Sequence, residues 1–85
     1  MSQSTDRRQW EQRLPPLDGL ATHWLIEADG IRLGSFSSVT EILDIVEETQ
    51  AVYDRIAATA VVLDDSGKIV EKTGRLTALW SRLDG

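Results

Sequence analysis

A single acidic, amphipathic stretch between two glycine-containing turns constrains this chain most, and it covers residues 38–57. Its apolar residues recur at spacings of three and four, which places them along one face of an α-helix. Ser38 and Glu41 have the spacing of a capping box, in which each side chain binds a backbone N–H of the first turn. Because Thr49 and the next residue interrupt the apolar stripe, we predict a helix over 38–57 that bends or stops near Glu48. This helix is expected to bury Ile42, Leu43, Val46 and Ile56.

The opposite face of the predicted helix is acidic. It carries Glu41, Asp44, Glu47, Glu48 and Asp54. Between residues 27 and 54 the chain has seven acidic side chains and a single arginine. Like charges three or four residues apart on a helix repel one another by a few tenths of a kcal/mol. The pattern has two interpretations: a solvated face that keeps the protein in solution, or a recognition surface that steers a basic partner.

Two turn signals flank the helix and predict two β-hairpins. Asp29-Gly30 is typical of a two-residue type I′ turn, in which both central positions need positive φ, and it predicts a hairpin over 21–36. Asp65-Ser66-Gly67 is typical of a type I turn with a bulge and predicts a second hairpin over 59–73. Because side chains alternate along a strand, the first hairpin has a predicted core face and a mixed second face. The core face holds Trp24, Ile26, Ala28, Ile31 and Leu33, and the second face holds His23, Leu25, Glu27, Arg32 and Phe36.

A second apolar stripe near the end of the chain predicts another helix, over 75–83. In this stripe, Leu79, Trp80 and Leu83 follow Leu76 by three, four and seven residues, which is the spacing of one helix face. Superposing the two halves of the chain aligns the two hairpin glycines and the two stripes, and common ancestry and coincidence both explain the match. The predicted fold is therefore α+β with the order ββαββα, in which two hairpins form a four-stranded antiparallel sheet packed by two helices.

The first 18 residues are polar except for Trp10 and two leucines. A serine or threonine near the start can cap a short helix through Arg13, which Pro15-Pro16 then ends, because proline cannot donate to a helix. Unanchored termini are usually disordered. We therefore predict a mobile arm over 1–18, with docking of Trp10 onto the body as the alternative, and a single α+β domain over 19–85.

Composition excludes several classes of function. The chain has 85 residues, a formal net charge of −5 and no cysteine, so disulfides and thiolate metal sites are excluded. An acidic chain does not offer the basic patch that a nucleic-acid partner requires. The start of the chain lacks a secretory signal, and no apolar segment reaches the length of a membrane span. The expected compartment is the cytoplasm, with no nucleic-acid or membrane partner.

No residue pattern indicates catalysis. His23 is the only histidine and belongs to no recognisable catalytic motif. The segment Asp64-Asp65-Ser66-Gly67 lacks the alternating oxygen ligands and the final glutamate of a calcium loop, so it indicates a turn. We therefore expect no enzyme activity, no cofactor and no metal.

The expected function is that of a small acidic adaptor or regulator that binds another protein with a basic surface, an inhibitor being one form of this. Two alternatives stay open: a small-molecule or peptide pocket between the sheet and the helices, and a homodimer. Exposed tryptophans are enriched among interface anchors, and the mixed face of the first hairpin offers further apolar contacts. The predicted partner-binding residues are Glu41, Asp44, Glu47, Glu48, Asp54, Trp10, Leu25 and Phe36.

Overall fold

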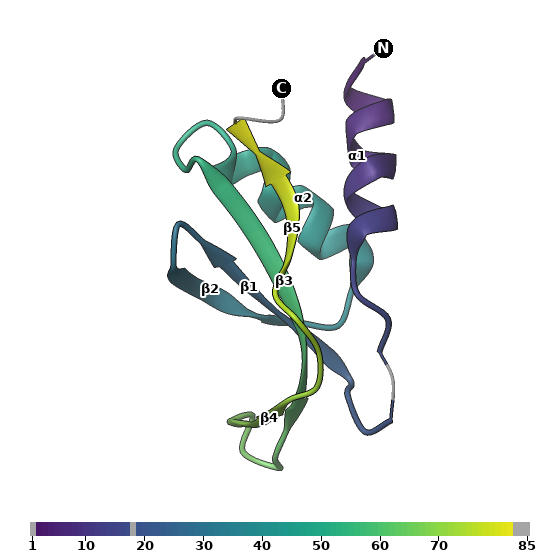
Figure 1. Ribbon diagram of the computed structural model, residues 1–85, viewed down its shortest axis with the longest axis vertical. Helices are drawn as coiled ribbons and strands as arrows, with labels where there is room; N and C mark the ends of the chain where they lie inside the picture. The colour runs from purple at the N-terminus through teal and green to yellow at the C-terminus, as the bar shows by residue number, and fades with distance from the viewer. Residues whose placement is uncertain (1, 18, 83–85) are drawn as a thin grey trace.

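The computed structural model describes residues 2–17 and 19–82, and over these it shows two helices and an antiparallel sheet (Figure 1). The elements are α1 (Ser2–Arg13), β1 (His23–Ala28), β2 (Ile31–Phe36), α2 (Val39–Thr49), β3 (Arg55–Leu63), β4 (Ile69–Lys72) and β5 (Thr77–Ser81). The strand order is β2-β1-β3-β4, and β5 also pairs with β3. The predicted α+β class is confirmed. No helix in the described ranges is long and apolar enough to cross a membrane.

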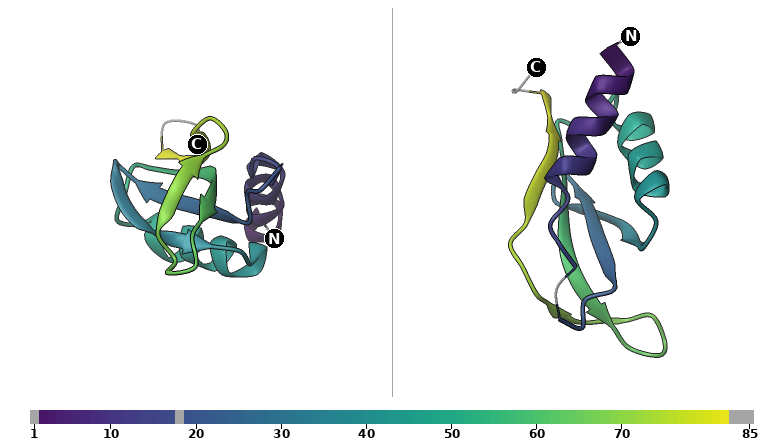
Figure 2. Two further views of the ribbon diagram at one scale, coloured as in Figure 1. Left: turned by 90° about the horizontal axis from the view of Figure 1, so that it is seen from below. Right: turned by 90° about the vertical axis from the view of Figure 1, so that its right-hand side faces the viewer.

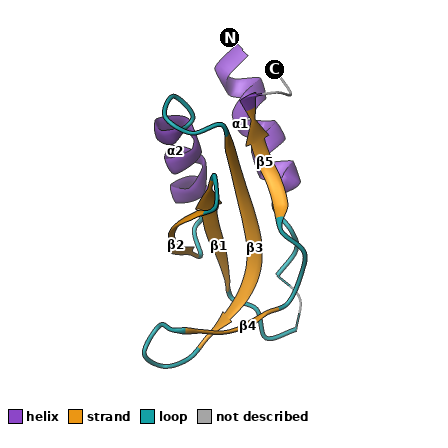
Figure 3. Ribbon diagram, turned by 60° about the vertical axis from the view of Figure 1, so that its left-hand side comes forward, coloured by secondary structure: helices purple, strands orange, loops and turns teal. Residues whose placement is uncertain are grey.

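The first strand of the second hairpin, β3, begins at Arg55 and so before the predicted hairpin over 59–73, whereas β4 lies within those bounds. β4 pairs with the end of β3, and β5 pairs with its beginning, while β1 pairs along most of β3. β4 and β5 therefore follow one another along the edge of β3 that β1 leaves free (Figure 3). The two hairpins together form one antiparallel sheet, as predicted.

The predicted helix over 75–83 is wrong in the described part of this segment, because Thr77–Ser81 forms β5; Leu83, the last residue of the predicted stripe, lies outside the described residues. The register between β3 and β5 shifts opposite Ile56 and leaves Leu79 as an extra, bulged residue. A bulge breaks the two-residue alternation of a strand, so Leu79 is buried and the adjacent Trp80 also packs against the core. Leu76, by contrast, is 46% exposed. Because of the bulge, the neighbouring residues Leu79 and Trp80 both pack against the core, as they would on one face of a helix. The second half of the chain therefore does not repeat the ββα order of the first half.

α2 is shorter than the predicted helix over 38–57. It covers Val39–Thr49 and ends where the polar residues interrupt the stripe. The predicted cap is confirmed, since Ser38 Oγ accepts a hydrogen bond from the Glu41 backbone N–H at 3.3 Å. Ile56 belongs to β3 and not to the helix, because the chain turns before Arg55 and pairs with β1. The predicted burial of Ile42, Leu43, Val46 and Ile56 is nevertheless confirmed.

The first hairpin has the predicted turn but a shifted register. Asp29 and Gly30 have φ values of 51° and 83°, as a type I′ turn requires. The pairs next to the turn face each other as predicted, but a bulge at Leu33 then shifts the register, so that Trp24 pairs with Phe36. The shift moves Phe36 from the mixed face to the face that the helices cover, where it packs against the core.

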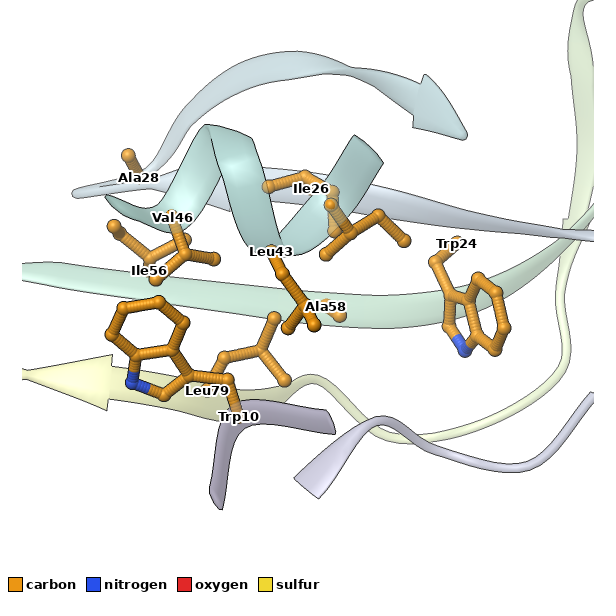
Figure 4. Close-up of a cluster of buried hydrophobic side chains, with 10 residues drawn as sticks. Trp10, Trp24, Ile26, Ala28, Leu43, Val46, Ile56, Ala58 and Leu79 are labelled. Atoms are coloured by element: carbon orange, nitrogen blue, oxygen red, sulfur yellow. The ribbon is translucent and has the colours of Figure 1, made fainter. Parts of the chain in front are cut away.

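Both helices lie on one side of the sheet, and the main core fills the space between them and the strands (Figure 2). Trp10 of α1 is only 3% exposed and closes this core beside Leu79 (Figure 4). The indole N–H of Trp24 donates to the Pro15 carbonyl at 2.7 Å, which ties the segment after α1 to the sheet. The structure therefore shows Trp10 docked onto the body. The mobility of residues 1–18 in solution stays a prediction. The buried cluster is Trp10, Trp24, Ile26, Ala28, Ile42, Leu43, Val46, Ile56, Ala58 and Leu79.

Candidate acidic binding surface

Four of the predicted acidic residues form one exposed surface on α2. We call it the acidic surface, and it consists of Glu41, Asp44, Glu47 and Glu48, all of which are exposed. They point to solvent because the apolar side of α2 packs on the sheet, as the helical period requires. The side chains of Asp44 and Glu47 keep 55% and 45% of their exposure. These carboxylates can therefore be reached from solvent.

The structure adds a basic partner that the sequence pattern did not reveal. The Arg7 guanidinium of α1 lies against α2, with Nη2 3.0 Å from Asp44 Oδ1 and Nη1 2.8 Å from Glu47 Oε1. A planar guanidinium with several N–H donors suits two carboxylates at once. The signal that could have located it is the three-residue spacing from Arg7 to Trp10, which places both on one face of α1.

Asp54 does not belong to the acidic surface. It lies after the end of α2, and its Oδ1 is 2.8 Å from Nε of Arg82. The backbone N–H of Arg82 also donates to the Asp54 carbonyl at 2.8 Å. Asp54 thus connects the start of β3 to the end of β5, and its predicted place on the helix face is wrong because α2 ends earlier.

The three predicted apolar contact residues lie inside or against the molecule. Trp10 is 3% exposed and Leu25 is 0% exposed. Phe36 is half-buried and packs against the core, with its ring close to Gly34. A partner would reach Trp10 or Leu25 only after the chain rearranges. Their predicted role in binding stays a prediction.

One concavity of about 250 Å³ lies on the sheet face opposite the helices. Glu27 and Ala57 face each other on that side of the sheet, since Ala28 and Ile56 belong to the helix-covered core. The concavity is smaller than most ligand pockets, which hold about 300–1,000 Å³. It does not lie between sheet and helices, where the alternative pocket was predicted. Its lining residues are Glu27, Asp29, Gly30, Arg55, Ala57 and Leu76.

A carboxylate in that concavity has a structural role. Asp29 accepts hydrogen bonds from the backbone N–H groups of Asp54 and Arg55 at 3.0–3.2 Å. The Asp29 N–H in turn donates to the Arg55 carbonyl at 3.0 Å. The turn of the first hairpin therefore fixes the entry of the chain into β3.

The turn of the second hairpin is built around Asp64. Its carboxylate accepts from the Ser66 hydroxyl at 2.7 Å and from the Ser66 and Lys68 backbone N–H groups at 2.9 Å each. These donors, the Ser66 hydroxyl first, lower the pKa of the Asp64 carboxyl. Gly67 has a φ of 87°, so the predicted left-handed position is confirmed.

The only histidine of the chain lies at the start of β1. His23 is half-buried, and its Nδ1 lies 2.7 Å from the Thr22 hydroxyl oxygen. Within residues 7–17 and 19–82, no three histidine, aspartate or glutamate side chains are grouped so that they could hold a metal ion.

Comparison of the chain with protein-family models, with curated proteins and with solved structures gives no match.

Proposed function

We propose that this chain is a small, acidic, non-enzymatic cytoplasmic protein that binds another protein through the acidic surface of α2. The observation that supports the proposal is the seating of the Arg7 guanidinium between Asp44 and Glu47. This surface holds an arginine at hydrogen-bonding distance within the chain itself. The partner that fits it carries arginines on an exposed, basic surface.

The two ion pairs of Arg7 contribute so little free energy that another cation can replace Arg7 on the acidic surface. Ion pairs between exposed side chains contribute about 0–1 kcal/mol each. A partner arginine can therefore replace Arg7 at small net cost. Glu41 and Glu48 extend the surface along α2 and are exposed. Their charge adds to the field that steers a basic partner and raises the association rate.

The alternative function, a small-molecule or peptide pocket, has weaker support from the geometry. The concavity beside Leu76 is small, and its Asp29 carboxylate already accepts two backbone N–H groups. Ligand pockets usually bury most of their ligand and present free polar groups. We therefore favour protein binding over a pocket.

The experiment is a pull-down from the source cell with three baits, read by mass spectrometry. The first is the unaltered chain. The second carries Glu41→Lys and Glu48→Lys, which leaves both Arg7 ion pairs in place. The third carries Asp65→Lys and Glu71→Lys, two exposed positions on the second hairpin, so that its net charge equals that of the second bait.

The proposal predicts proteins that the first and third baits retain and the second loses. For such a protein, the association rate should fall in the second variant, and raising the salt concentration should reduce the difference, because salt screens exposed charges. Identical sets of proteins on all three baits would contradict the steering of a basic partner by Glu41 and Glu48.

A further inference from the structure

α1 is attached to the body through one face that carries very few anchoring side chains. Trp10 is the single apolar residue between Ser2 and Arg13, and it is buried in the core. One turn before it, Arg7 pairs with two carboxylates of α2. One turn after it, Nη1 of Arg13 donates to the Leu79 carbonyl of β5 at 3.2 Å. The three side chains seat α1 against α2 and β5, and we call the surface that these two elements present to α1 the arm groove.

The chain returns from α1 to the sheet through a glycine turn. After α1 it runs beside the sheet, reverses direction at the turn of Gly19 and Leu20, and re-enters as β1 (Figures 1 and 2). Gly19 has a φ of 63°, a conformation that residues with a Cβ rarely adopt. Apart from the chain neighbours of Gly19, nothing lies within 4 Å of a Cβ built there, so a side chain at this position would meet backbone strain and not a clash. Leu20 is 79% exposed.

We propose that α1 is an exchangeable arm, which in a pair of copies docks into the arm groove of the other copy when the Gly19 turn opens. The occupant is a second copy of this chain, because arm and groove already match. The two ion pairs, the Trp10 site and the Arg13 hydrogen bond form again between copies, so exchange needs no new complementarity. Pro15 and Pro16 restrict the backbone of the segment before the turn, and the hydrogen bond from the Trp24 indole to the Pro15 carbonyl also forms again between copies. This self-association uses the same Asp44 and Glu47 carboxylates as the proposed function, but it requires no foreign partner, so its tests succeed or fail separately from the pull-down.

The first test opens the turn. Gly19→Val places a β-branched residue at a positive φ, which strains the closed arm and is relieved when the turn extends. In the full chain, sedimentation equilibrium should show a dimer dissociation constant at least about tenfold lower than for the unaltered chain. This factor corresponds to the free-energy cost of a left-handed residue with a Cβ, which the opened turn no longer carries. The matched control is Gly67→Val, which has a φ of 87° and equally empty surroundings. Because both states keep that hairpin, the control should lose stability without dimerising.

The second test identifies the surface, using charge reversal in the Gly19→Val chain. Arg7→Glu places a carboxylate against Asp44 and Glu47, whereas Asp44→Arg with Glu47→Arg places guanidiniums against Arg7. When the two variants are mixed, each arm meets an opposite charge only in the groove of the other variant. Native mass spectrometry should therefore show more heterodimer than either homodimer. Combining all three reversals in one chain should restore the homodimer.

Two results would overturn the proposal. One is a Gly19→Val chain that dimerises no more than the Gly67→Val control. The other is a dimer whose composition ignores the charge reversals, since that dimer would use a different surface. The unaltered and control chains report on folding in both tests through their unfolding curves.

Discussion

At the scale of single residues, Gly34 shows why a strand position can lack the space for a side chain. It pairs with Ile26 in the middle of the first hairpin and has a φ of 145°. A Cβ built there would lie 3.0 Å from Cζ of the Phe36 ring. The ring of Phe36 thus fills the space that a side chain at Gly34 would need, next to the bulge that turned Phe36 toward the core.

We expect Gly34→Ala to destabilise the protein by about 1–3 kcal/mol, because it adds backbone strain and a clash with an aromatic ring. Urea unfolding of the full chain measures the difference. Gly74→Ala is the matched control, since nothing lies within 4 Å of its Cβ, and it should change stability by no more than about 0.5 kcal/mol. Equal effects of the two changes would show that Phe36 does not occupy this space.

Asp64 provides a prediction about pH. Its folded pKa lies below the ordinary value of 3.8, with the Ser66 hydroxyl as the largest cause. A depressed carboxyl pKa contributes stability above the unfolded value, and this contribution is lost as the pH falls through the folded pKa. Carboxyl NMR titration should show the Asp64 pKa rising toward its ordinary value in Ser66→Ala. An unchanged pKa in that variant would contradict the role of the hydroxyl.

At the scale of elements, β5 shows how a bulge can resemble a helix. An apolar stripe at helical spacing should bury both Leu76 and Leu79, whereas the bulged strand buries Leu79 and leaves Leu76 46% exposed. The bulge lies where Arg13 of α1 binds the Leu79 carbonyl. The spacing of apolar residues within this segment gives no information about that contact with α1, so it could not predict the bulge.

The two leucines form a matched pair for an unfolding experiment. Leu79→Ala should cost about 2–5 kcal/mol as a large-to-small change in the core. Leu76→Ala removes a partly exposed side chain and should cost less than about 1 kcal/mol. Similar losses at the two positions in denaturant melts would support the helical stripe instead of the strand.

At the scale of the whole molecule, α1 shares one core with the sheet through Trp10. Trp10→Ala should cost about 3–5 kcal/mol and should raise hydrogen-exchange rates in α1 more than in β3, because α1 loses its single apolar anchor. Glu11→Ala, at the exposed neighbouring position, should leave both rates nearly unchanged. If α1 amides in the unaltered chain exchange as fast as in an unfolded peptide, the predicted mobile arm is correct and the docked helix is a minor state.

The acidic surface is partly a sequence property and partly a tertiary one. Its charges follow from the spacing of Glu41, Asp44, Glu47 and Glu48 along one helix, which the sequence predicts. The seating of Arg7 does not, because it joins residues 37 and 40 positions apart. The proposed recognition of arginine depends on that second contact.

Features that depend on near neighbours along the chain can be predicted from the order of the residues. Both glycine turns, the cap at Ser38, the end of α2 near Thr49 and the buried stripe of α2 follow from local backbone preferences and helical period. The α+β class follows because two hairpins and an amphipathic helix can bury their apolar faces only against one another.

Features that require distant residues to meet depend on the folded chain. The strand at 77–81, the bulge that turns Phe36 inward and the burial of Trp10 all depend on pairing or packing across the chain. A bulge changes which side chains face the core without leaving a local signal, since the inserted residue is defined by its partner strand. A lone tryptophan in a polar helix likewise acquires a position only when the groove that receives it has formed.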